Sequence, residues 1–183
     1  MRAVLVIDMQ EGMADRIRSG RPTATPDAPG RIATLLQQAR DSGIPVIHVL
    51  HDDLHPDSPV RKGLPGAAPM PCAVPLTGET VLWKHGSSAF HGTGLDAHLK
   101  ARGITELVVA GAVAAFCVTS TTRQASDLGY RVLLPQDALL GFDIPAHDGG
   151  RIDAATVQRV TLSLLGADFA TLTTVRELAA QTA

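Results

Sequence analysis

The fold is decided by the stretch L-V-V-A-G-A-V-A-A-F-C-V-T-S-T-T-R-Q-A-S-D-L, residues 107–128. Its first part is apolar and rich in β-branched residues, which predicts a buried strand. The part after Cys117 predicts a helix over residues 118–128, which Gly129 can end by taking a positive φ. Because a strand that runs directly into a helix is half of a parallel crossover unit, this stretch predicts a parallel sheet.

The same alternation continues on both sides of this stretch. Strands are predicted over residues 3–8, 45–50, 80–84, 106–111, 131–138 and 169–175, and further helices over 31–43, 95–103 and 153–165. Strands covered by helices on both faces are apolar throughout, as these runs are. The sequence therefore predicts an α/β fold with a parallel sheet between two helical layers.

Composition narrows the class of protein. The 183 residues carry a net charge of -2, with 45% hydrophobic and 3% aromatic residues, which disfavours a nucleic-acid partner. No apolar run reaches the roughly 18 residues of a membrane span. Two cysteines, and a first strand too close to Met1 to leave room for a signal peptide, predict a cytoplasmic protein.

Three residue types that can carry chemistry follow predicted strands. Asp8 and Lys84 end their strands, and Cys117 lies where a strand passes into a helix. Each alone has a structural explanation: Asp8 could cap a helix, Lys84 could be an exposed strand end, and Cys117 could be a thiol packed in the core. Together they lie at the carboxyl edge of one sheet, where open parallel sheets bind ligands.

This trio is chemically self-consistent. A helix start and a nearby ammonium favour the thiolate form of Cys117, which makes it a nucleophile. A carboxylate such as Asp8 can take the thiol proton and deliver it to a leaving amine, with Lys84 as electrostatic partner. We therefore expect attack on an amide or a similar carbonyl of a small molecule. No G-x-G-x-x-G turn follows the first strand, so no nucleotide cofactor is predicted.

Four segments together resemble the isochorismatase-like cysteine hydrolases, a family that includes nicotinamidases, N-carbamoylsarcosine amidohydrolases and isochorismatases. The resemblance implies one isochorismatase-like hydrolase domain over residues 1–183, in three α/β/α layers around a six-stranded, mostly parallel, Rossmann-like sheet. It also implies an Asp8, Lys84 and Cys117 triad and a homodimer or homotetramer. The segments are V-I-D-M-Q (6–10), W-K-H-G-S-S-A-F-H-G-T-G-L (83–95), G-A-V-A-A-F-C-V-T-S-T (111–121), and A-S-D-L-G-Y-R-V (125–132) with Asp137-Ala138.

The resemblance further implies a non-proline cis peptide, by position between Val113 and Ala114. It would turn the backbone N–H groups of Ala114 and Cys117 toward an oxyanion. The family commonly has Thr where Ala114 stands, so substrate identity is open. Ala115 and Phe116 make this turn more apolar than is usual in the family, which suggests a pocket for an apolar or aromatic group of the substrate.

Gln10 and Phe90 are two more candidates for contact with substrate, because they fall in the matching motifs close to the triad residues. For Phe90, packing in the core is an equal alternative.

A metal site is incomplete in the sequence. The run Asp53-Leu54-His55-Pro56 resembles the element with which nicotinamidases begin a zinc or iron site, and His51 and Asp52 lie beside it. No further His follows before His85. The sequence therefore predicts no metal ligands and no metal cofactor.

Three functions remain open. The first is a cysteine amidohydrolase that cleaves the C–N bond of a small amide or ureido compound through a thioester. The second is a vinyl-ether hydrolase of the isochorismatase type, and the third is a small-molecule-binding domain without catalysis.

Overall fold

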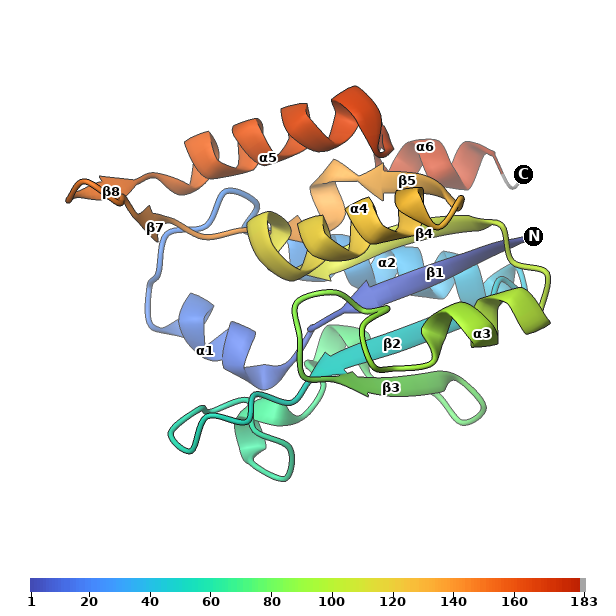
Figure 1. Cartoon of the computed structure of the whole chain (residues 1–183), viewed down its shortest axis with the longest axis horizontal. Coiled ribbons are helices and arrows are strands. Elements are labelled where there is room, and N and C mark those ends of the chain that lie inside the picture. The colour runs from blue at the N-terminus through green and yellow to red at the C-terminus, as the bar shows by residue number, and fades with distance from the viewer. Residues whose placement is uncertain (182–183) are drawn as a thin grey trace.

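The computed structural model of the protein describes residues 1–181 and has a parallel sheet at its centre (Figure 1). The strand order is β3-β2-β1-β4-β5-β9, and every neighbouring pair is parallel. This confirms the predicted six-stranded α/β fold. The strands are β1 (Arg2–Ile7), β2 (Val46–His51), β3 (Thr80–Lys84), β4 (Glu106–Ala112), β5 (Arg131–Pro135) and β9 (Thr171–Thr173). A short strand β6 (Leu139–Leu140) also pairs with β4, and β7 (Ile144–Pro145) forms a hairpin with β8 (Arg151–Ile152).

Helices cover both faces of the sheet, so the central strands are buried on two sides, whereas the edge strands β3 and β9 are partly exposed. In β1, for example, Val4 and Val6 pack into one core cluster, while Leu5 and Ile7 pack into the other. Figure 1 shows α3, α4 and α5 on the near face, and α2 on the far face. The helices are α1 (Glu11–Arg18), α2 (Ala28–Asp41), α3 (Leu95–Ala101), α4 (Thr119–Asp127), α5 (Ala154–Asp168) and α6 (Val175–Ala180). Among residues 1–181, no helix combines the length and apolar character needed to cross a membrane.

The ends of two predicted strands are corrected by the structure. Residues 136–138 form a 3₁₀ turn, η4 (Gln136–Ala138), and Val175 begins α6. Both departures share one cause, because the Asp137 carboxylate accepts a hydrogen bond from the Val175 N–H at 3.0 Å. Thr174 caps α6 through its side chain. The polar residues in these apolar runs therefore end the strands early.

Strands β1 and β4 approach so closely that only glycine fits at one position. Gly111 pairs with Ile7 and has a φ of 123°. A Cβ atom at Gly111 would lie 2.1 Å from the Ile7 carbonyl oxygen. The approach matters because Asp8 follows Ile7 directly, and the turn that carries Cys117 follows β4.

Substitution of Gly111→Ala is therefore expected to prevent folding or to lower the midpoint of chemical denaturation strongly. Gly129→Ala is the matched control, because Gly129 also has a positive φ, 89°, but open space around it. The control should cost only about 1–2 kcal/mol from backbone strain. Equal losses of stability in the two variants would contradict the steric explanation.

A second polar cluster lies at the opposite, amino-terminal edge of the sheet. Glu79 accepts hydrogen bonds from Arg40 at 2.8 Å and 3.0 Å and contacts Nε2 of buried His48 at 3.0 Å. Burial alone would raise the pKa of Glu79, but hydrogen bonds from Arg40, from the Leu76 N–H and from His48 lower it to about 2. This cluster ties α2 to β2 and to the turn before β3.

The lowered pKa of Glu79 predicts a pH-dependent contribution to stability. Such a carboxylate stabilises the fold above its usual pKa of 4.5, and this contribution is lost as the pH falls from 4.5 toward about 2. Glu79→Gln should therefore lower the denaturation midpoint at pH 7, and the difference from wild type should shrink below pH 4.5. A difference that stays constant with pH would contradict the assignment.

Candidate active site

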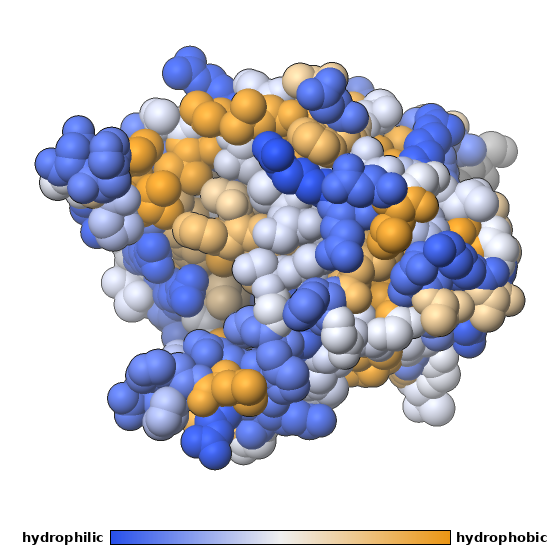
Figure 2. Space-filling view, in the orientation of Figure 1, coloured by the Kyte–Doolittle hydropathy of each residue, from blue (hydrophilic) through white to orange (hydrophobic). Residues whose placement is uncertain are grey.

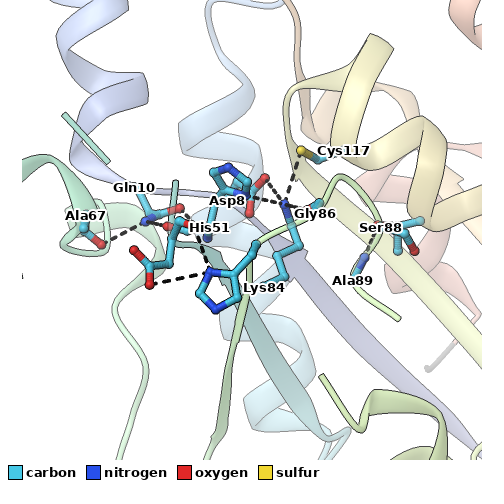
Figure 3. A network of polar contacts seen from close by, with 12 residues as sticks. Asp8, Gln10, His51, Ala67, Lys84, Gly86, Ser88, Ala89 and Cys117 are labelled. Carbon is cyan, nitrogen blue, oxygen red and sulfur yellow. Dashed lines mark hydrogen bonds and ion pairs between the residues drawn. The ribbon is translucent and has the colours of Figure 1, made fainter. Parts of the chain in front are cut away.

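The structure brings Asp8, Lys84 and Cys117 into mutual contact at the carboxyl edge of the sheet. The Lys84 ammonium donates to Oδ2 of Asp8 at 2.8 Å and to Sγ of Cys117 at 3.2 Å, so it bridges the two groups (Figure 3). Asp8 follows β1, Lys84 ends β3, and Cys117 lies in the π-helical turn η3 (Ala114–Val118) after β4. Strands β1 and β4 are neighbours although they are far apart in sequence, and the site lies where the strand order reverses.

Asp8 is held in an unusual backbone conformation. Its φ is 51°, and it is the one residue other than glycine within 1–181 that is recorded with a positive φ. Its N–H donates to the carbonyl of Val49 at 2.9 Å, which continues the pairing of β1 with β2 by one residue. Left-handed backbone in a residue other than glycine is unfavourable and is found mainly where a site requires it. The conformation directs the carboxylate toward Lys84.

His51 is a member of the site that the sequence had suggested only as part of a metal cluster. Its Nδ1 lies 3.1 Å from the Lys84 ammonium, which also donates to the carbonyl of Gly86 at 3.1 Å. Burial lowers the pKa of His51, and the Lys84 charge lowers it further, so Nδ1 accepts as a neutral ring. The signal for His51 was present in the pattern, because His51 and Lys84 end neighbouring strands in register.

The surroundings of Cys117 favour the neutral thiol, and not the thiolate that the sequence predicts. Burial raises the pKa of Cys117 to about 12, the Asp8 carboxylate raises it too, and Lys84 only partly opposes them. Burial also raises the pKa of Asp8, although Lys84 opposes this shift. Oδ1 of Asp8 is buried and without a hydrogen-bond partner in the described chain. A buried carboxylate oxygen without a partner thus lies beside the Cys117 thiol.

A cavity of about 450 Å³ opens onto the sulfur. Its walls come from the end of β1, from α1, from the loop after β2 and from η3. Figure 2 shows a mostly hydrophilic lobe at the lower left, where Figure 1 places the loop after β2. The lining residues are Asp8, Met13, Arg16, His51, Asp53, His55, Asp57, Ser58, Pro59, Val60, Val113, Phe116 and Cys117.

Comparisons with known proteins assign the family. The sequence pattern of the Isochorismatase domain matches residues 2–165. The chain belongs to the isochorismatase family. A crystal structure of an isochorismatase-family protein from Chromobacterium violaceum is 39% identical, with a TM-score of 0.94 over 99% of this chain and 93% of the other. The family resemblance of the sequence is thus confirmed.

Two further relatives of this isochorismatase-family chain have named activities. Streptothricin hydrolase from Streptomyces noursei is 37% identical over 80% of this chain and 52% of its own length. N-carbamoylsarcosine amidase from Thermoplasma acidophilum is 26% identical, with a TM-score of 0.75 over 95% of this chain and 96% of the other. The family therefore consists of hydrolases, and it includes enzymes that act on amides.

Of the three residues predicted to bind substrate, only Phe116 lines the cavity. Phe116 is 53% exposed at its edge. The Gln10 side chain is fully buried and bonded to backbone groups of His51 and Ala67, so it joins β1 to the loop before β3. The second prediction, Phe90, stacks on Tyr130 in the core with ring centroids 5.8 Å apart. Motif proximity misplaced Gln10, because adjacency in a motif does not set the direction of a side chain. For Phe90, the alternative of core packing is the one that the structure bears out.

The cis peptide lies one residue earlier than predicted. It joins Ala112 to Val113, whereas the sequence comparison placed it between Val113 and Ala114. Ala114 is 1% exposed and does not line the cavity, whereas Val113 does. The Val113 N–H donates to no acceptor among residues 1–181. Val113, and not Ala114, is therefore the residue that follows the cis peptide and lines the cavity.

The acidic and histidine residues of the loop after β2 are used within the protein. The His55 N–H donates to Asp53 at 3.1 Å, the Lys62 N–H donates to Asp52 at 2.7 Å, and His51 faces Lys84. Within the described chain, no group of three or more His, Cys, Asp or Glu side chains is arranged to hold a metal ion. In the D-x-H-P run, the hydrogen bond from the His55 N–H to Asp53 forms a local turn.

The resting charge state predicts an unusual response to loss of Asp8. In Asp8→Asn, burial still raises the pKa of Cys117, but the repelling carboxylate is gone and Lys84 remains. Alkylation of Cys117 by iodoacetamide at pH 8 should therefore become roughly ten-fold faster for each unit by which its pKa falls. Rates are measured by mass spectrometry in a Cys72→Ser background, with Asp53→Asn as a control on the cavity wall. Slower alkylation of Asp8→Asn than of wild type would contradict this charge assignment.

Proposed function

We propose that this protein is a cysteine amidohydrolase that cleaves the C–N bond of a small amide or ureido compound through a thioester. The observation that carries the proposal is the Lys84 ammonium, which is fully buried and bridges the Asp8 carboxylate and the Cys117 sulfur at the floor of an open cavity. The amidase among its relatives supports the same chemistry.

In the first step, Cys117 attacks the carbonyl carbon while its proton passes to Asp8. The unpartnered Oδ1 of Asp8 is the acceptor, and Lys84 stabilises the negative charge on both groups during the transfer. The carbonyl π-electron pair moves to oxygen, which forms a tetrahedral oxyanion. Attack and proton transfer are coupled because the thiol, with its pKa near 12, is not ionised beforehand.

Backbone N–H groups of η3 would hold this oxyanion. Val113 offers an N–H without a partner among the described residues, and Cys117 offers its own at the cavity floor. Each such donor contributes roughly 3–4 kcal/mol to acyl transfer. The intermediate then collapses, the C–N bond breaks, and Asp8 returns its proton to the leaving amine.

Water completes the cycle by hydrolysing the thioester. Asp8, again a carboxylate, takes a proton from the attacking water, the C–S bond breaks, and the proton returns to sulfur. The products are a carboxylic or carbamic acid and ammonia or a small amine. Since the Asp8 carboxylate transfers protons both in the formation and in the hydrolysis of the thioester, this chemistry needs no additional acid or base from the protein.

The proposal predicts that Cys117→Ala lowers ammonia release by at least roughly 1,000-fold, because no thioester can form. Wild type is screened against small amides, carbamoyl compounds and ureides, and Cys72→Ser is the control that should keep full activity. Mass spectrometry of quenched turnover should show an acyl adduct on Cys117.

Two outcomes would point to the alternatives. Hydrolysis that survives Cys117→Ala but fails in Asp8→Asn would favour a vinyl-ether hydrolase, in which the carboxyl group donates the proton. Ligand binding without turnover, unchanged by Cys117→Ser and Lys84→Ala, would favour a binding domain.

A further inference from the structure

Three arginines stand on or just after α1, and only one lacks an anionic partner. Arg18 pairs with Glu11 at 2.8 Å and with Asp15 at 2.6 Å, and Arg21 pairs with Asp143 at 3.1 Å. Within residues 1–181, the Arg16 guanidinium makes neither an ion pair nor a hydrogen bond. The surroundings of α1 do contain acidic residues, because both arginines that follow Arg16 in the sequence have acidic partners.

Arg16 is also the arginine that lines the catalytic cavity. Cys117 lines the same cavity from η3, whereas the Arg18 side chain is 60% exposed and faces solvent. The Arg16 guanidinium lies 5.9 Å from the ring centroid of buried Phe142, and Arg21 lies 5.2 Å from the same ring. Phe142 and Arg21 thus fix the environment of Arg16 without neutralising its charge.

An unpaired charge at a half-buried position is unfavourable. Burial and the neighbouring Arg21 lower the pKa of Arg16, although a guanidinium stays charged at neutral pH. A buried or partly buried cation normally has an anionic partner in the protein. Where the partner is missing inside a binding cavity, a bound ligand can supply it.

The acids on the cavity wall do not supply this partner. Asp53 accepts from the His55 N–H, and a hydrogen bond with Ser58 also lowers its pKa. Asp57 is exposed on the same loop and, like Asp53, forms no ion pair with Arg16. The cavity therefore has an uncompensated cation on its α1 wall, in addition to the Lys84 charge that Asp8 compensates.

We infer that Arg16 binds a carboxylate group of the substrate, so that the preferred substrates are amides that carry a carboxylate at some distance from the scissile bond. This inference rests on the proposed amidohydrolase function. The guanidinium offers a planar fork that matches a carboxylate with two hydrogen bonds. Arg16 is thus a specificity residue, and a neutral amide leaves its charge unpaired.

The kinetic test compares a half-amide with its neutral diamide. Wild type should favour succinamate or glutaramate over succinamide or glutaramide. Arg16→Gln should raise KM for the half-amides roughly 10- to 100-fold, the range for loss of a charged hydrogen-bonded pair, and leave the diamides unchanged. Arg16→Lys keeps the charge and should retain part of the preference for half-amides. Arg18→Gln should leave KM unchanged for both half-amides and diamides. Equal effects of Arg16→Gln on both kinds of substrate would overturn the inference.

An equilibrium measurement separates this inference from the proposed function. Succinate and glutarate have no scissile bond, so their binding is measured by titration calorimetry on wild type, Arg16→Gln and Arg18→Gln. Binding that is lost only in Arg16→Gln supports the carboxylate site, even if no amide is hydrolysed, in which case only the amidohydrolase fails. Binding that is absent in wild type, or equal in wild type and Arg16→Gln, overturns the carboxylate site whatever the turnover.

Discussion

The structure of the site depends on one buried ammonium group. Lys84 is fully buried and Asp8 is 3% exposed, so each would be strongly destabilising without the other. The ammonium has three hydrogens and faces four acceptors, on Asp8, His51, Gly86 and Cys117. Its hydrogen bonds are therefore shared among these groups. These hydrogen bonds connect β1, β2, β3 and η3. The same contacts therefore stabilise the packing at this edge of the sheet and position the groups of the proposed reaction.

The sheet provides the geometry that this shared ammonium needs. Because β1 and β4 are adjacent, Asp8 and the turn that holds Cys117 lie side by side, and Gly111 allows the backbones to approach closely. Lys84 comes from two strands away, and its long side chain spans that separation. Cys117 thus lies on an irregular turn, while Asp8 and Lys84 extend from strand ends.

The fold and the meeting of Asp8, Lys84 and Cys117 could be predicted from the sequence, because both follow from regular patterns. Apolar runs that alternate with helices give a parallel sheet, and residues at strand ends meet at one edge. The other residues around the site could not be placed from the sequence, because their positions depend on side-chain directions and on irregular backbone. Gln10 points to the backbone of the next loop, and Phe90 points into the core. Helix α1, which supplies Arg16, has only eight residues, too few for its apolar spacing to predict a helix.

The charge state of the site also required coordinates, because it is a balance of opposing effects. A helix start and an ammonium favour a thiolate, but desolvation and the facing carboxylate outweigh them, so that the pKa of Cys117 rises to about 12. A neutral thiol is a poor target for oxidants and alkylating agents, which react with thiolates. In the proposed mechanism the nucleophile is formed only as the substrate carbonyl accepts the electron pair. The carboxylate that suppresses the thiolate at rest is then the group that accepts the proton during attack, so the same contact protects and activates the sulfur.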